Sequence, residues 1–234
     1  MGNEHHSFKS LSPWWRHTVI IVMVIGFTIL IWLSVRTYSD APPIPERVED
    51  SSGQTLFTRA DILAGQQVFL KYGLMENGSI WGHGAYLGPD FSAEYLHTLS
   101  IDASETIARR SYGNEVRKLN TSEANVIHAE VEQLLKQNRY HLSSQTLLFT
   151  DIEALSYRRQ LQKWTTYFIQ PANNFGLPGK YISNATDIKQ LTSFFAWTAW
   201  ERNKKRSDNE PLSFPCGVHD AFRRERVFFL IFPR

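Results

Sequence analysis

The sequence of 234 residues contains one cysteine, Cys216. A single thiol excludes an internal disulfide, a zinc site built from cysteines, and the Cys-x-x-Cys-His motif that attaches a haem covalently. A strong charge of one sign is also missing, because 25 Lys and Arg residues oppose 23 Asp and Glu residues and leave a net charge of +2. This balance provides no electrostatic attraction toward nucleic acid, so we expect no nucleic-acid partner.

Long apolar runs are scarce as well, and a single one, at residues 18–35, is long enough to cross a membrane. Its 18 residues carry no charge, and as a helix they would span about 27 Å. Aromatic residues, which favour membrane interfaces, stand at both ends: Trp14, Trp15, Trp32 and Tyr38. A cleaved signal peptide is the alternative, but the run is long for one and YSDAPP offers no small-x-small cleavage site. We predict a transmembrane helix at residues 18–38 after a cytoplasmic tail of residues 1–17.

The charges around this helix do not set its orientation. Lys9 and Arg16 precede it while Arg36 and Arg47 follow it, so the two sides carry equal numbers of basic residues. The short tail and the large mass downstream favour a soluble domain on the periplasmic or outer side.

Residues 39–55 are polar and rich in proline, which predicts a linker. From residue 56 the sequence is typical of helices, and no segment alternates with period two. Three pairs have the spacing of helix N-terminal caps: Thr58 with Asp61, Thr150 with Glu153, and Asn184 with Asp187. Residues 92–99, 102–110 and 121–137 predict further helices. The sequence therefore predicts a mainly α domain at residues 56–200.

The helical spacing also predicts the core. The inner faces would use Ile127, Val131, Leu134 and Leu135, then Leu155, Trp164 and Phe168, then Leu191, Phe194, Phe195 and Trp197. Residues 73–89 form a glycine-rich, irregular stretch. It follows no strand and lacks the lysine of a phosphate-binding loop, so its glycines are better explained by close packing of the backbone.

The string AGQQVFLKYGLMENGSIWGHGAYLGPDFSAEYLHTL, residues 64–99, resembles the N-terminal soluble region of quinol-dependent nitric oxide reductases, members of the haem-copper oxidase superfamily. Residues 151–168 and 191–200 are also similar to that family. Together with the membrane helix, the resemblance covers roughly residues 10 to 200.

The resemblance extends to the cytochrome c subunit of the related cytochrome-dependent reductases. There, a helix with glycine and an aromatic residue leads into Cys-x-x-Cys-His and then a Gly-x-Gly-Ala-Tyr turn. The matching helix positions are Gly65, Val68 and Phe69, and the matching turn positions are Gly82, Gly84, Ala85 and Tyr86. Between them, Leu74 and Asn77 replace the two cysteines, and Gly78 replaces the axial histidine. The resemblance thus implies a cytochrome c-like helical domain without haem.

The family couples two NO molecules to N2O with two electrons from quinol. The resemblance implies haem b, haem b3 and a non-haem iron as cofactors, held by histidines on later membrane helices. The eight histidines here are scattered outside any apolar span. We therefore expect no catalytic residue and no cofactor in this chain, whose partners would be the lipid bilayer and the catalytic membrane bundle.

Calcium is a further cofactor that the resemblance implies. In the cytochrome-dependent relatives the Gly-Ala-Tyr turn helps to hold a calcium ion, and a backbone carbonyl and a tyrosine oxygen are suitable ligands. Gly84 and Tyr86 are the candidates here; the alternative is a tyrosine that packs under a tight turn. His83, within the same turn, is interpreted as a loop or surface residue, and Asp90 as solvated surface.

After Trp200 the sequence departs from the family and runs ERNKKRSDNEPLSFPCGVHDAFRRERVFFLIFPR. We predict that residues 201–234 are an aberrant tail, from truncation or a shifted reading frame; a tail specific to one lineage is the alternative.

The sequence as a whole predicts the front part of a quinol-dependent nitric oxide reductase in the bacterial inner membrane. A membrane-anchored interaction or sensor domain is the rival hypothesis. An electron-carrying cytochrome is disfavoured by the missing haem motif.

Overall fold

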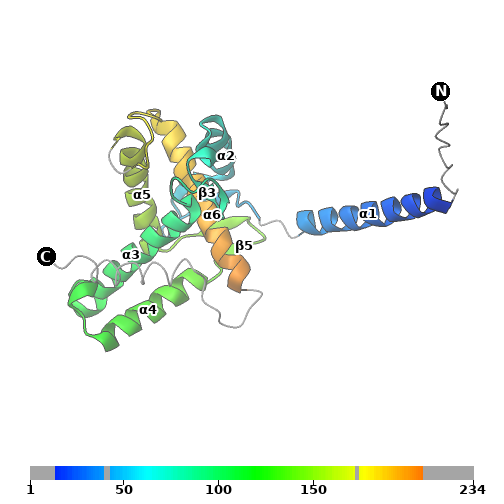
Figure 1. The fold of residues 1–234 in the computed structure, drawn as a ribbon. Coiled ribbons are helices and arrows are strands. Elements are labelled where there is room, and N and C mark those ends of the chain that lie inside the picture. Colours follow the sequence, from blue (N-terminus) through cyan, green and yellow to red (C-terminus); the bar gives the residue numbers. More distant parts are fainter. Residues whose placement is uncertain (1–13, 40–42, 172–173, 208–234) are drawn as a thin grey trace, which may run out of the picture. The chain divides into compact units, whose positions relative to one another are not determined.

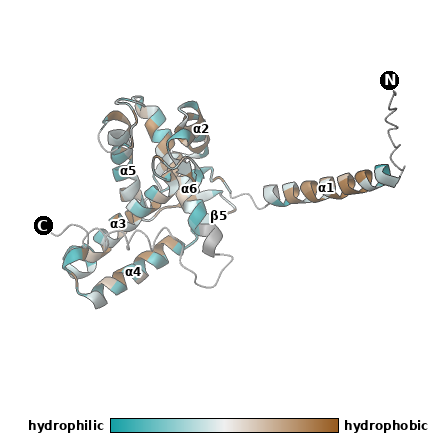
Figure 2. Ribbon diagram, viewed as in Figure 1, coloured by the Kyte–Doolittle hydropathy of each residue, from teal (hydrophilic) through white to brown (hydrophobic). Residues whose placement is uncertain are grey.

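The structure, a computed structural model, describes residues 14–39, 43–171 and 174–207. The chain divides into two compact units, Met1–Pro43 and Ile44–Arg234 (Figure 1). The first unit contains helix α1, Trp14–Ser39, whose hydrophobic residues extend along most of its length (Figure 2). Among the described residues, α1 is the one helix long and apolar enough to cross a membrane. It covers the predicted residues 18–38 and begins earlier, within the predicted tail.

The second unit is a mainly α domain, as predicted. Its helices pack around one apolar core, and short strands join them. The helices are α2 (Arg59–Lys71), α3 (Phe91–Tyr112), α4 (Thr121–Lys136), α5 (Asp151–Ile169) and α6 (Ala185–Ser207), with short 3-10 helices η1 (Leu74–Glu76) and η2 (Val116–Lys118). The strands are β1 (Arg47–Glu49), β2 (Thr55–Thr58), β3 (Ser79–Ile80), β4 (His83–Gly84), β5 (Tyr140–His141) and β6 (Thr146–Leu148).

Four of these strands form a sheet in the order β2-β1-β6-β5, which the sequence did not predict. β1 runs antiparallel to β2 and parallel to β6, so Val48 lies between Phe57 and Leu147 and is fully buried. The predicted linker of residues 39–55 is therefore too long, because β1 already belongs to the domain. Strands of two to four residues show no period-two pattern, and β1 pairs with a segment far away in the sequence.

The helix starts predicted from the three cap pairs are confirmed. Thr58 and Asp61 cap α2 reciprocally through side chain and backbone, and Thr150 and Glu153 do the same for α5. At the start of α6, the Asn184 side chain accepts a hydrogen bond from the Thr186 amide at 2.9 Å. These bonds satisfy amide groups that a helix N-terminus leaves without partners.

The first and last helices of the domain, α2 and α6, cross in direct backbone contact. A Cβ at Gly65 would overlap the Gln190 carbonyl oxygen and come within 2.7 Å of the Phe194 Cβ. Phe69, one turn later on α2, packs against Phe194 with ring centroids 5.9 Å apart. Glycine at position 65 is therefore what allows the two helices to approach so closely.

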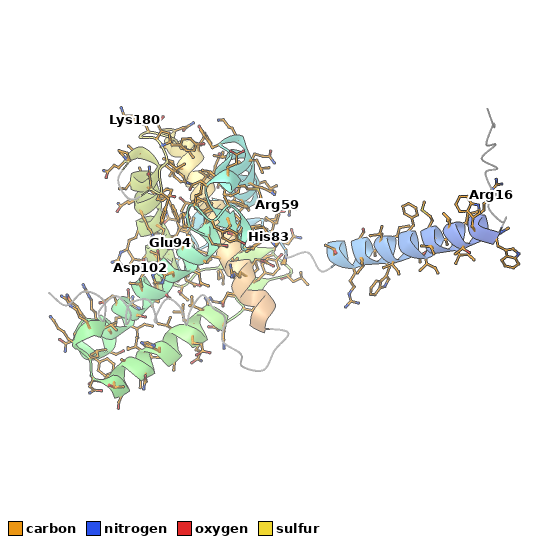
Figure 3. The ribbon with its side chains drawn as sticks, in the orientation of Figure 1. Arg16, Arg59, His83, Glu94, Asp102 and Lys180 are labelled. Atoms are coloured by element: carbon orange, nitrogen blue, oxygen red, sulfur yellow. The ribbon has the colours of Figure 1, made fainter. Side chains whose placement is uncertain are left out.

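Residues 92–99 and 102–110 form one continuous helix, α3, rather than the two short helices predicted. Asp102 looked like a boundary, but its carboxylate accepts from Ser156 at 2.7 Å and pairs with Arg159 at 2.9 Å. Glu94, which is labelled with Asp102 in Figure 3, pairs with Lys163 of α5. Glu94 and Asp102 of α3 thus face α5.

On α5, Trp164 and Phe168 are fully buried as predicted, but Leu155 is not part of the inner face and remains 38% exposed. Ser156 and Gln160 are fully buried instead. The Gln160 side chain donates to the Tyr95 carbonyl at 3.1 Å, so a polar contact with α3 takes the place of an apolar one.

The predicted boundary at Trp200 does not interrupt the fold. α6 continues to Ser207, and Glu201 is buried. The Asn203 side chain donates to the Leu135 carbonyl of α4. Residues 201–207 therefore belong to the last helix, whereas residues 208–234 of the predicted tail lie outside the described residues.

Candidate functional site

The positions singled out in the sequence lie in one folded segment, residues 74–90. The amides of Asn77 and Gly78 both donate to the Leu74 carbonyl, at 3.2 and 2.9 Å, which makes a tight turn. The chain then returns, and the Ala85 amide donates to the Met75 carbonyl at 2.8 Å. The three positions of the lost haem motif and the Gly-Ala-Tyr turn are therefore neighbours in space.

Gly78, at the position of the axial histidine, has no room for a side chain. A Cβ there would overlap the Pro89 carbonyl oxygen and come within 2.7 Å of the Phe91 ring. Gly78 is buried, as is Leu74, which has no exposed surface. A histidine at this position would require the backbone and the Phe91 ring to move.

Phe91 belongs to a cluster of buried aromatic side chains from four helices. Its ring stacks on Phe195 with centroids 4.8 Å apart and planes 10° from parallel. Trp164 contacts both, at 5.6 and 5.1 Å. The cluster consists of Phe69, Phe91, Trp164, Phe168, Phe194 and Phe195. These rings fill the interior next to the haem-motif segment.

Asn77, at the position of the second cysteine, holds loops together. Its side-chain amide donates to the Phe175 carbonyl at 3.3 Å, and its oxygen accepts from the Tyr167 hydroxyl at 3.4 Å. Burial raises the pKa of Tyr167 to about 12, and its hydroxyl is the donor of this bond because the amide oxygen can only accept. The Gly88 amide also donates to the Asn77 carbonyl.

These residues do not fit a covalently bound haem. The two thioether positions carry Leu74 and Asn77, and the ligand position cannot accept even a Cβ. The adjacent interior is filled by aromatic rings such as Phe91 and Phe195. Leu74, Asn77 and Gly78, which the resemblance aligns with the haem motif, therefore do not fit a covalently attached haem.

The two residues expected to bind calcium are at the surface. Tyr86 is 87% exposed, so it does not pack under the turn, and that alternative is wrong. Gly84 and His83 are also exposed, and His83 is labelled in Figure 3. Among the described residues, no three or more His, Cys, Asp or Glu side chains gather in a way that could hold a metal ion. Any cation at Gly84 and Tyr86 would need ligands from elsewhere.

Asp90 has a role that the sequence interpretation missed. Instead of being solvated surface, it caps α3 by accepting from the Ala93 amide at 2.8 Å. Its other oxygen accepts from the Ser79 hydroxyl and the Gly82 amide and lies 3.7 Å from Arg202 of α6. One carboxylate thus fixes the β3-β4 turn between α3 and α6. The Asp-x-x-Ala spacing at a helix start was the available signal.

Trp81 attaches the same turn to α6. Its indole NH donates to the Thr198 carbonyl at 2.9 Å, and its ring lies 5.9 Å from that of Trp197. Its φ of 55° is unusual for a bulky residue. The turn is therefore held rigidly on the last helix.

The fold defines a class, namely a mainly helical, cytochrome c-like domain that follows an apolar helix of membrane-spanning length. The family model that describes the cytochrome c-like domain of the nitric oxide reductase protein NorB matches residues 45–215. The chain belongs to this family. The match continues past Trp200, in agreement with the uninterrupted helix α6. The comparison with curated proteins gave no match.

Proposed function

We propose that this chain is the membrane-anchored, cytochrome c-like part of a quinol-dependent nitric oxide reductase, and that it is not itself catalytic. The observation that carries the proposal is the closed position at Gly78, where a Cβ would collide with Pro89 and Phe91. A domain without haem cannot relay electrons from a soluble cytochrome. A reductase that contains it needs another donor, and a membrane quinol is the donor that remains available to an anchored enzyme.

In this proposal the reaction takes place in the catalytic membrane bundle. Two NO molecules, two electrons and two protons give one N2O and one water. The ligands of haem b, haem b3 and the non-haem iron would lie in that bundle, which the domain would cap. The site would be the bacterial inner membrane, with the domain on the outer side.

Calcium binding at Gly84 and Tyr86 remains part of the proposal. The Gly84 carbonyl and the Tyr86 hydroxyl would supply two oxygen ligands, whereas calcium takes six to eight. The exposure of Tyr86 supports a site that is completed by a second surface. Calcium would then bind at the junction with the membrane bundle and only weakly to this chain alone.

The proposal is tested by measuring NO consumption in membranes that contain the full chain together with the membrane bundle. We expect quinol to support NO consumption and reduced cytochrome c not to support it. A haem stain of this chain after denaturation should be negative, with membranes lacking the chain as the control. A covalently attached haem, or dependence on cytochrome c, would show that the proposal is wrong.

A further inference from the structure

Tyr95, Gln160 and Trp164 each bury a polar side-chain atom that has no hydrogen-bond partner among the described residues. The atoms are the Tyr95 hydroxyl oxygen, the Gln160 side-chain oxygen Oε1 and the Trp164 indole nitrogen. Tyr95 is 2% exposed, and the other two residues are fully buried. Because a buried polar group without a partner costs free energy, such groups in folded proteins usually bind either the protein itself or ordered water.

The three residues lie where α3 packs against α5. Glu94, near the start of α3, pairs with Lys163 of α5. Asp102, about two turns later on α3, pairs with Arg159, which is earlier on α5. The two helices therefore run antiparallel, and the first half of α3 lies beside the second half of α5.

Direct contacts place the unpartnered groups on consecutive turns of these two helices. The Gln160 side chain donates to the Tyr95 carbonyl at 3.1 Å. Trp164 follows Gln160 by four residues, so both side chains are on the same face of α5. The Trp164 ring lies 5.6 Å from that of Phe91, which precedes Tyr95 by four residues on α3. The polar atoms thus belong to one region of the interior rather than to separate parts of the core.

Rotation of the Gln160 amide group does not provide the missing bond. Its nitrogen donates to the Tyr95 carbonyl and also lies 3.4 Å from the Ser156 hydroxyl oxygen. Exchanging the nitrogen and the oxygen would bring the oxygen against the Tyr95 carbonyl, and neither of these atoms can donate. The observed orientation is therefore the one that the backbone of α3 requires, and Oε1 remains an acceptor that lacks a donor.

The three groups together are suited to water. The indole NH can only donate, the amide oxygen can only accept, and the hydroxyl can do either. None of the three carries a charge at neutral pH. A neutral set that mixes donors and acceptors favours a small neutral molecule with both functions over a cation or an anion. A buried water typically makes about three hydrogen bonds, which matches the number of groups.

We propose that the domain binds ordered water in its interior between α3 and α5, at the Tyr95 hydroxyl, the Gln160 oxygen and the Trp164 indole NH. The bound water supplies the hydrogen bonds that these groups lack and thereby links α5 to α3 inside the domain. This internal water site belongs to the folded domain alone and is independent of the electron donor proposed above.

NMR spectroscopy of the full chain in detergent micelles tests the site directly. Trp164→Phe removes one indole NH and so identifies the Trp164 signal in the spectrum of the unchanged chain. We expect that signal and the Gln160 side-chain amide protons to show cross-peaks to water, with the sign that direct contact gives rather than the sign of chemical exchange. If neither group shows such a cross-peak, the proposal is overturned.

Tyr95→Phe provides a second test, because the two possibilities change stability in opposite directions. If water binds, the change removes one of its partners, and the Tm of the full chain should fall by about 2 to 4 °C. If nothing binds, the change removes an unpaired buried hydroxyl and the Tm should rise, which would overturn the proposal. Tyr157→Phe is the matched control, since its buried hydroxyl is 2.9 Å from that of Ser193, and it should lower the Tm by a similar amount. Circular dichroism of each variant establishes that the fold is intact.

Discussion

Two glycine contacts in this domain have opposite consequences. At Gly65, close approach lets α2 cross α6 and preserves the arrangement of a cytochrome. At Gly78, which the resemblance aligns with the haem-binding histidine, close approach to Pro89 and Phe91 leaves no room for a side chain. The comparison teaches that the helix crossing depends on shape and apolar packing alone. The arrangement of the helices can therefore persist without a cofactor if other groups fill the interior.

The cluster of buried aromatic side chains fills the interior of the domain. Phe91, Trp164, Phe168 and Phe195 are each less than 2% exposed. Full burial of one such side chain contributes about 1.5 to 3 kcal/mol, so four of them provide stabilisation on the scale of a domain's net stability.

The largest expected effect comes from reversing the change at the haem motif. Leu74→Cys, Asn77→Cys and Gly78→His together restore the motif in sequence. We expect no covalent haem and a loss of about 3 kcal/mol or more in unfolding free energy, because the imidazole has no space. A haem stain and thermal unfolding followed by circular dichroism provide the measurement.

The control for this variant keeps Gly78 and carries only the two cysteines. It should lose less stability, since Leu74→Cys removes apolar contacts but forces nothing into the Phe91 ring. If the triple variant binds haem and retains its stability, the aromatic rings do not exclude a haem, and the claim that position 78 has no room for a side chain is wrong.

The next effect concerns the helix crossing. Gly65→Leu should destabilise the domain by about 2 to 3 kcal/mol, because its side chain would push α2 away from the Gln190 backbone. Gln66→Leu adds a similar side chain on the exposed side of the same helix and should change stability by less than about 0.5 kcal/mol. Chemical denaturation of both variants measures the difference. Equal stabilities of the two variants would mean that the crossing of α2 and α6 does not require a glycine at position 65.

The smallest effect is a pH dependence. Burial raises the pKa of Tyr157 to about 12, and its hydroxyl is 2.9 Å from that of Ser193 on α6. Because the folded state favours the neutral phenol, its contribution is complete below pH about 10 and is lost as the pH rises through about 12. At the upper end the loss is on the order of 2 to 3 kcal/mol.

Tyr157→Phe should therefore flatten the fall in stability between these two pH values. Unfolding at a series of alkaline pH values and tyrosinate absorbance provide the measurement. Tyr86→Phe, which changes an exposed ring, is the control and should leave the profile as it is. If the stability of the Tyr157→Phe variant falls equally steeply with pH, other ionisable groups cause the fall.

Local chemistry could be predicted from the sequence, and contacts between distant segments could not. The caps at Thr58 and Thr150 depend on residues three positions apart, which the sequence displays directly. The boundary wrongly placed near Asp102 arose because its partners, Ser156 and Arg159, lie on another helix. The sheet was missed for the same reason, since β1 pairs with β6 across about a hundred residues.

The candidate site shows the same division. The residues at Leu74, Asn77 and Gly78 were visible in the sequence, and the structure adds that Gly78 has no room for a side chain. Asp90 was missed because three of its five contacts, those to Ser79, Gly82 and Arg202, come from segments outside its own helix start.

The position of β1 has a mechanical consequence. β1 is the first regular element after the membrane helix, and it lies inside the sheet between β2 and β6. Just before it, the Glu46 amide donates to the Gln145 carbonyl at 2.8 Å, and the Glu46 carbonyl accepts from the Arg59 amide at 3.0 Å. A pull on the anchor along β1 would load bonds to both neighbouring strands at once, in shear, rather than opening them one by one. Separating β1 from the domain would therefore require its hydrogen bonds to both neighbouring strands to break together.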